Sequence, residues 1–253
     1  MKKLLGLLLF AAPLFALMAE PVLAQDVAGL LNIDVDDDLL SSKRIFQLFM
    51  LITVLSLAPS IVMMVTSFTR IVIVLSFLRT AMGLQNTPPN IVLISLAMFL
   101  TLFIMAPTLE KAYEDGVGPY LEDRITEEAA IKNTIDPFRD FMGTQVGDKE
   151  LDLFVGMLQE PPENVTSARD VPLQALIPAF MITELRRAFE IGFLLFLPFL
   201  VIDLAVASIL MSMGMMMLPP VIISLPFKVI FFVLIDGWTL LTGSLVQSFN
   251  VNI

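Results

Sequence analysis

Five charged residues lie within or beside the last two apolar runs of the sequence: Glu184, Glu190, Asp203, Lys228 and Asp236. A charged side chain at the centre of a bilayer costs about 2.5–3.5 kcal/mol on insertion scales, so such residues normally face another helix, a bundle interior or water. Two interpretations follow. The charges form ion pairs between helices or subunits, or they line a hydrophilic pathway.

Three of these residues are candidates for pairing. Asp203 is the only charge in the run PFLVIDLAV, so its partner must come from another helix. Lys228 is the only basic residue after Arg187, which makes Glu184 and Asp203 its candidate partners. The sequence therefore predicts inter-helix or inter-subunit ion pairs among Glu184, Asp203 and Lys228.

Enzymatic chemistry is disfavoured by the composition. The chain has no cysteine and no histidine, which removes the thiol nucleophile, the thiolate metal site and the commonest general base. A Ser–Lys or carboxylate pair can be drawn from Ser224, Lys228 and Glu184, but no context such as GxSxG accompanies it. We therefore expect no catalytic residue, no metal site and no cofactor. A proton-coupled or small-solute transporter with Asp203 and Lys228 as its relay is the alternative function, although no inverted repeat supports it.

A methionine-rich stretch, MSMGMMMLPP, occupies residues 211–220. Methionine is unbranched, has three rotatable bonds and carries a polarizable sulfur. A ring of such side chains can close a pore as a soft apolar plug and can deform around an extended chain, and hydrophobic constrictions resist ions by dewetting. Gly214 permits a turn, and Pro219 and Pro220 stop the helix. From composition alone, packing at a helix end is the simpler interpretation.

Apolar helices must position these residues. Hydrophobic residues make up 57% of the chain and the mean hydropathy is +0.86, whereas an ordinary globular domain is ~45–50% apolar. Residues 1–24 combine two lysines, an apolar core and small residues before Gln25, which predicts a signal peptide cleaved after Ala24. Residues 25–44 form an acidic N-terminal arm. Residues 45–107 hold the first hydrophobic helical pair, broken at Pro88 and Pro89.

The rest of the chain divides into an acidic segment and a second apolar pair. Residues 108–170 include 15 acidic and 6 basic residues, a net charge of −9 against −10 for the whole chain. Amphipathic stretches indicate short helices, so 108–172 is predicted to be an acidic, extracytoplasmic helical insertion. Residues 173–253 hold the second pair, with candidate spans at 189–211 and 221–246 around the methionine-rich loop. The predicted fold class is an all-α membrane-associated protein, in which two hydrophobic helical hairpins with about four apolar segments flank that insertion.

Four stretches of the sequence are similar to the FliP family of flagellar export-gate proteins, and injectisome type III secretion systems carry a related subunit. The signature stretch is PAFMITELRRAFEIGF at 178–193. The others are SFTRIVIVLSFLRTAMG at 67–83, PFLVIDLAVASILMSMGMMMLPP at 198–220 and LPFKVIFFVLIDGW at 225–238. The resemblance runs from about residue 46 to the C-terminus. The signal peptide and the acidic segment agree in position and length more than in sequence.

This resemblance implies a function that composition does not show. Members of the family form a ring of five copies together with R-type and Q-type export-gate subunits, and the B-type switch subunit belongs to the same apparatus. The assembly lies in the bacterial inner membrane at the flagellar basal body. It passes unfolded flagellar export substrates and performs no chemistry itself.

The resemblance also assigns roles to residues. It implies that Met215, Met216 and Met217 form a gasket that closes the channel. It further implies helices stacked in a cone and partly raised out of the membrane plane. The acidic balance of the chain, with no basic stripe, argues against nucleic acid as a partner.

Overall fold

The structure is a computed structural model that describes residues 42–160, 162, 168–215 and 218–249. This described part is helical and contains no strand. Its elements are α3 (Ser42–Met64), α4 (Phe68–Ala81), α5 (Asn90–Ala112), α6 (Gly118–Leu121), α7 (Glu127–Gln145), α8 (Asp148–Val155), α9 (Leu173–Ser212), α10 (Pro220–Leu234) and α11 (Gly237–Gln247). The predicted signal peptide and most of the predicted acidic arm lie outside the described residues. The chain divides into two compact units, Met1–Met63 and Met64–Ile253, and apart from α3 the second contains every element described below.

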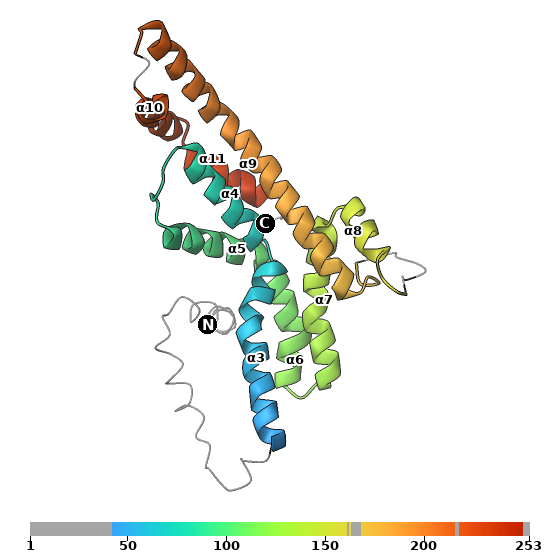
Figure 1. Ribbon diagram of the computed structural model, residues 1–253. Helices are drawn as coiled ribbons and strands as arrows, with labels where there is room; N and C mark the ends of the chain where they lie inside the picture. Colours follow the sequence, from blue (N-terminus) through green and yellow to red (C-terminus); the bar gives the residue numbers. More distant parts are fainter. Residues whose placement is uncertain (1–41, 161, 163–167, 216–217, 250–253) are drawn as a thin grey trace, which may run out of the picture. The chain divides into compact units, whose positions relative to one another are not determined.

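The core of the second unit forms where α4 packs along α9 (Figure 1). The side chains of α4 that are 0–1% exposed recur every three or four residues, as one face of a helix requires, and include Ile71, Val74, Leu75 and Leu78. A glycine of α9 permits the close approach, because a Cβ added to Gly192 would lie 2.6 Å from Cδ2 of Phe77. Two apolar helices are thereby held in direct contact.

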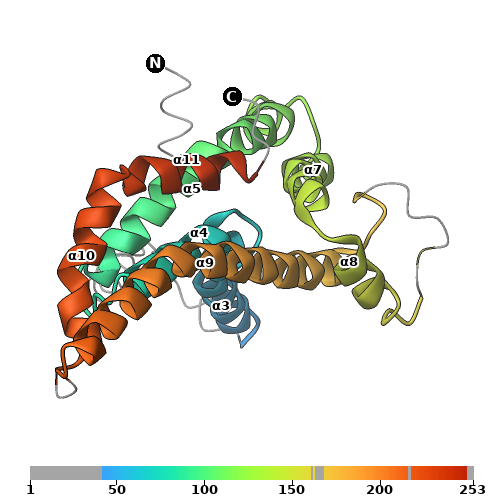
Figure 2. The same cartoon turned by 90° about the horizontal axis from the view of Figure 1, so that it is seen from above.

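The last two helices return toward the start of the unit. α10 runs back beside the C-terminal part of α9, and α11 then passes α5 (Figure 2). The sequence predicted one segment over 221–246, but the structure has two helices bent by 64°. Asp236 at the break has a φ of +51°, a left-handed conformation that ends a right-handed helix. Gly237 follows so close to Phe232 that an added Cβ would lie 2.2 Å from its ring.

The acidic segment is helical and packs on α9. α7 and α8 form an apolar cluster with the N-terminal part of α9, whose buried members are Met142, Val171, Ala175, Leu176 and Phe180. The apolar run of α5 ends at Pro107, but the helix continues to Ala112 and then through a π-helical turn, Tyr113–Val117. Proline removes one backbone hydrogen bond without ending this helix.

Several of these helices are suited to a membrane. Within the described residues, Asn90–Leu121 and Leu173–Ser212 are long and apolar enough to cross one, with mean hydropathies of 2.3 and 2.6. The α3–α4 and α10–α11 pairs raise the number to four if each is counted as one broken span. The predicted fold class, an all-α chain with about four apolar segments in two pairs, is confirmed.

Candidate functional site

A buried ion pair joins α4 to α9. Arg70 Nε donates a hydrogen bond to Glu184 Oε2 at 2.8 Å, and Arg70 Nη2 donates to Glu184 Oε1 at 2.5 Å. The two side chains are enclosed, with exposed fractions of 1% and 0%. Two parallel bonds from a guanidinium to a carboxylate form one of the stronger charge-assisted arrangements in proteins. The pair therefore fixes both the separation and the register of the two helices.

Four more side chains complete what we call the Arg70 cluster: Gln145, Arg187, Ser248 and Phe249. Arg70 Nη1 donates to the carbonyl of Ser248 at 3.1 Å and to its hydroxyl at 2.9 Å. The Arg70 guanidinium carbon lies 3.6 Å from the centroid of the Phe249 ring, a cation–π contact. Gln145 Oε1 accepts from Arg70 Nη2 at 3.2 Å and from Arg187 Nη1 at 2.8 Å. The cluster thus attaches the end of α7 and the residues after α11 to the α4–α9 pair.

A second ion pair connects α9 with α10. Lys228 Nζ lies 2.6 Å from Asp203 Oδ2, and the two side chains are 4% and 30% exposed. Lys228 Nζ also donates to the carbonyl of Ala81 at 3.1 Å, and the Ser224 hydroxyl donates to Asp203 Oδ1 at 2.5 Å. We call these four residues the Lys228 cluster. Because Ala81 is the last residue of α4, the cluster ties the α9–α10 hairpin to the end of that helix.

We call residues 211–218, of which the structure describes 211–215 and 218, the hairpin tip. Gly214 has a φ of +75°, which glycine adopts without a steric penalty. Its N–H donates to the Met211 carbonyl at 3.1 Å, and the Met215 N–H donates to the Leu210 carbonyl at 2.9 Å, so α9 ends in a Schellman motif. α10 begins at Pro220, where the N–H that proline lacks would have had no partner inside the helix. The backbone of the tip is therefore turned by glycine and proline rather than by the methionine side chains.

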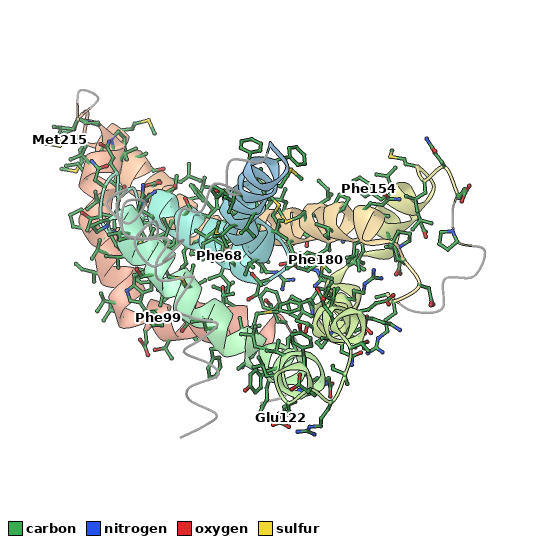
Figure 3. All side chains as sticks on the ribbon, turned by 90° about the horizontal axis from the view of Figure 1, so that it is seen from below. Phe68, Phe99, Glu122, Phe154, Phe180 and Met215 are labelled. Carbon is green, nitrogen blue, oxygen red and sulfur yellow. The ribbon has the colours of Figure 1, made fainter. Side chains whose placement is uncertain are left out.

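The described methionines of the tip face outward. Met211, Met213 and Met215 are 58%, 65% and 44% exposed, whereas Met105 and Met142 elsewhere in the chain are 1% exposed. Met215 lies at the end of the hairpin remote from Phe154 of α8 (Figure 3). Met216 and Met217, the other two residues of the predicted gasket, lie outside the described residues. The described methionines of the tip do not fill the core of this chain.

The structure places the three candidate ion-pair residues in two clusters. Lys228 bonds with Asp203, and Glu184 bonds with Arg70, which sequence reasoning did not select. A signal for Arg70 was present, because an arginine in the apolar run FTRIVIVL needs a partner as much as Asp203 does. Gln145 and Ser248 offered no signal, since polar residues near helix ends are ordinary.

Within the described residues, no group of three or more His, Cys, Asp or Glu side chains is placed to hold a metal ion. Each cluster instead contains a base bonded to a carboxylate and neutral hydrogen-bonding groups, and the Arg70 cluster also contains a second base, Arg187. Such an arrangement fixes helices against one another. It defines a class of protein: a helical membrane protein whose buried ion pairs hold a hairpin with an exposed, methionine-rich tip.

Comparison with known proteins identifies the family within this class. Residues 51–245 match the family model described as the FliP family. The chain is 52% identical over 244 residues to the flagellar biosynthetic protein FliP of Agrobacterium fabrum. The matched region covers 95% of this chain and 99% of that protein. It is 55% identical over 240 residues to that of Caulobacter vibrioides (95% and 88% covered) and 52% identical over 204 residues to that of Bacillus subtilis (80% and 91% covered). The chain belongs to the FliP family, as its signature stretches predicted.

Proposed function

We propose that this chain is a core subunit of the flagellar type III protein export gate. Several copies surround an axis, and their methionine-rich tips close a channel through which unfolded export substrates pass. The relatives are named for flagellar biosynthesis, which supports the flagellar role. The exposure of the tip is the observation that supports closure of the channel by these methionines.

The tip has the properties that a flexible closure needs. Three of its methionines are 44–65% exposed on a turn whose shape is set by Gly214 and Pro220. Exposed thioethers on a defined turn are costly in water unless copies of the turn meet and cover one another. When the copies meet, the three rotatable bonds of each methionine side chain let these side chains seal a hole of irregular outline and yield to a passing chain. Met215, Met216 and Met217 are the proposed gasket residues.

Assembly with other subunits is supported by the surface of α9. In the most apolar window of this helix only 17% of the residues are buried within the chain. Its exposed side chains include Phe189 at 57%, Phe193 at 64% and Leu194 at 64%. Lipid or neighbouring helices must cover this surface. We propose a ring of five copies that contacts R-type and Q-type subunits, with the B-type switch subunit beside them.

The proposed site of the assembly is the bacterial inner membrane at the flagellar basal body, with the acidic segment 108–172 on the extracytoplasmic side. In this arrangement the two ion-pair clusters hold the helices and the hairpin in place, and neither performs chemistry. The proposed gate supplies a controlled opening, and the energy for export comes from elsewhere in the apparatus.

Replacement of the three gasket residues tests the proposal. The triple variant Met215→Ala, Met216→Ala and Met217→Ala should still assemble but should let small ions and solutes leak across the membrane. Met157→Ala is the matched control, because Met157 is 68% exposed but lies just beyond the end of α8, far from the tip in sequence. Conductance is measured in membranes that contain the assembled complex, and motility reports export. Background conductance together with normal motility in the triple variant rules out the gasket.

A further inference from the structure

Asp236 carries a charge that the described chain does not use. It lies at the break of the α10–α11 pair, in the sequence FFVLIDGWTLL, and its side chain is exposed. No hydrogen bond or ion pair joins its carboxylate to any residue in the described part of the chain, although its backbone bonds normally with Val233 and Leu240. The apolar residues on either side are exposed as well, Leu234 at 79% and Leu240 at 57%.

The backbone conformation at residue 236 does not require an aspartate side chain. A φ of +51° suits asparagine as well as aspartate, and glycine better than either. Asp236 precedes the first turn of α11, but its side chain makes no capping hydrogen bond. An ionised carboxylate in an apolar candidate span is expensive unless a cation faces it. The cation that pairs with Asp236 must therefore come from outside the described part of the chain.

The bases of α4, α9 and α10 in an identical copy are poor candidates for that cation. Each base of α4, α9 and α10 already donates to an acceptor in its own chain: Arg70 to Glu184, Arg79 to Asn90, Arg186 to Glu150, Arg187 to Gln145 and Lys228 to Asp203. Recruitment of any of them by a second copy would break a bond already formed. A different polypeptide meets the requirement without that loss.

An apolar hollow adjoins Asp236. It has a volume of about 390 Å³ and lies between α9 and the bent α10–α11 pair. Its lining includes Leu194, Phe231, Ile235, Gly237, Leu240 and Ser244. Ile235 and Gly237 are the immediate neighbours of Asp236, so the backbone at residue 236 borders the hollow. A helix that fills the hollow with aliphatic side chains would bring its next turn to Asp236.

We propose that Asp236 and this hollow bind an apolar helix of a different polypeptide, one that carries a single lysine or arginine facing the carboxylate. The apolar side chains enter the hollow, and the cation pairs with Asp236 where lipid or the helix itself excludes water. The inference rests on the proposed assembly with other subunits. It specifies the chemistry of one contact within that assembly.

The test uses the full complex purified from its own bacterium in mild detergent, with polypeptide composition measured by native mass spectrometry. Asp236→Asn keeps a residue that tolerates the left-handed backbone and removes only the charge. It should lower retention of one partner polypeptide several-fold, and Asp236→Lys should lower it further. Asp123→Asn is the matched control, because Asp123 also has a positive φ, of 54°, but lies in the acidic segment. It should retain every partner.

Charge reversal then identifies the cation. In cells with Asp236→Lys, replacement of the facing lysine or arginine of the partner by glutamate should restore both partner retention and motility. A photo-reactive residue at Leu240 should crosslink to the same partner helix. The inference is wrong if Asp236→Asn retains the partners as Asp123→Asn does, or if restoring changes map to a base of this chain, including Lys43 and Arg44. A wild-type complex that holds no second polypeptide would contradict the proposed function itself.

Discussion

Arg70 of α4 and Glu184 of α9 are 114 residues apart in sequence, yet their side chains share two hydrogen bonds and are almost wholly enclosed. Removal of one member of such a pair leaves an uncompensated buried charge, which typically costs about 3–5 kcal/mol. The same Arg70 also holds Ser248 and Phe249, so its loss would release the chain end after α11. Arg70 therefore connects four parts of the second unit: α4, α9, the end of α7 and the residues after α11.

The first prediction concerns this pair. Glu184→Ala should destabilise the protein by about 3–5 kcal/mol because Arg70 would remain buried without its carboxylate. Glu190→Ala on the same helix is the control, since Glu190 is 65% exposed and its contact with Arg186 is long at 3.7 Å. Exposed pairs of this kind contribute about 0–1 kcal/mol. Thermal unfolding in detergent compares the two, and equal midpoints would contradict the assigned role of Glu184.

The second prediction concerns Lys228 and Asp203. Asp203→Ala and Lys228→Ala should each destabilise the hairpin, and the double variant should cost less than the sum of the two. The expected coupling is about 0.5–3 kcal/mol, toward the lower end because Asp203 is 30% exposed. Unfolding midpoints of the four proteins complete the cycle. Additive losses would show that the 2.6 Å contact contributes nothing to stability.

The third prediction concerns the turn at the tip. An alanine Cβ at Gly214 would meet no atom within 4 Å, so the cost of Gly214→Ala lies in the left-handed backbone and should be about 1–2 kcal/mol. Gly243→Ala is the matched control, because Gly243 is equally open but lies inside α11 with ordinary helical angles. There alanine should stabilise by up to about 1 kcal/mol. Denaturant unfolding measures both, and effects of the same sign would refute the backbone argument.

The fourth prediction concerns pH and a pair outside the apolar helices. Hydrogen bonds from Arg169, at 2.8 and 2.5 Å, lower the pKa of the Asp140 carboxyl below its ordinary value. Since the folded-state pKa is the lower one, the pair stabilises the fold above the unfolded pKa of about 3.9, and this contribution is lost as the pH falls through the folded-state pKa. The effect should be small, because both side chains are about half exposed.

Comparison of wild type with Asp140→Asn checks this prediction. The difference between their unfolding midpoints should be largest near neutral pH and should close as the pH falls below about 4. Asp115→Asn controls for the loss of one negative charge from the same acidic segment. A difference that is independent of pH would show that the substitution at Asp140 disturbs packing rather than removing the charge contact.

Local signals in the sequence were reliable where local interactions decide the structure. The apolar runs predicted the helices, because backbone hydrogen bonds in an apolar medium must be satisfied within each segment. The turn at the tip was readable from Gly214 and Pro220, since glycine permits a left-handed backbone and proline fixes φ wherever they occur. The signature stretches predicted the family, which the comparisons confirmed.

Positions where distant segments meet were not readable in the same way. Pro107 marks the end of an apolar run but not the end of α5, because the helix beyond it packs against α7. The break at Asp236 was missed, since the contact of Gly237 with the Phe232 ring is not visible as a pattern.

The sequence by itself determined that the chain is helical, apolar and turned at a methionine-rich loop, and that its intramembrane charges need partners. Only the tertiary structure decided which partners they have: Arg70 for Glu184, Lys228 for Asp203, and none among the described residues for Asp236. The physical reason is that helix formation depends on neighbours a few residues away, whereas an ion pair depends on which helices the fold brings within hydrogen-bonding distance.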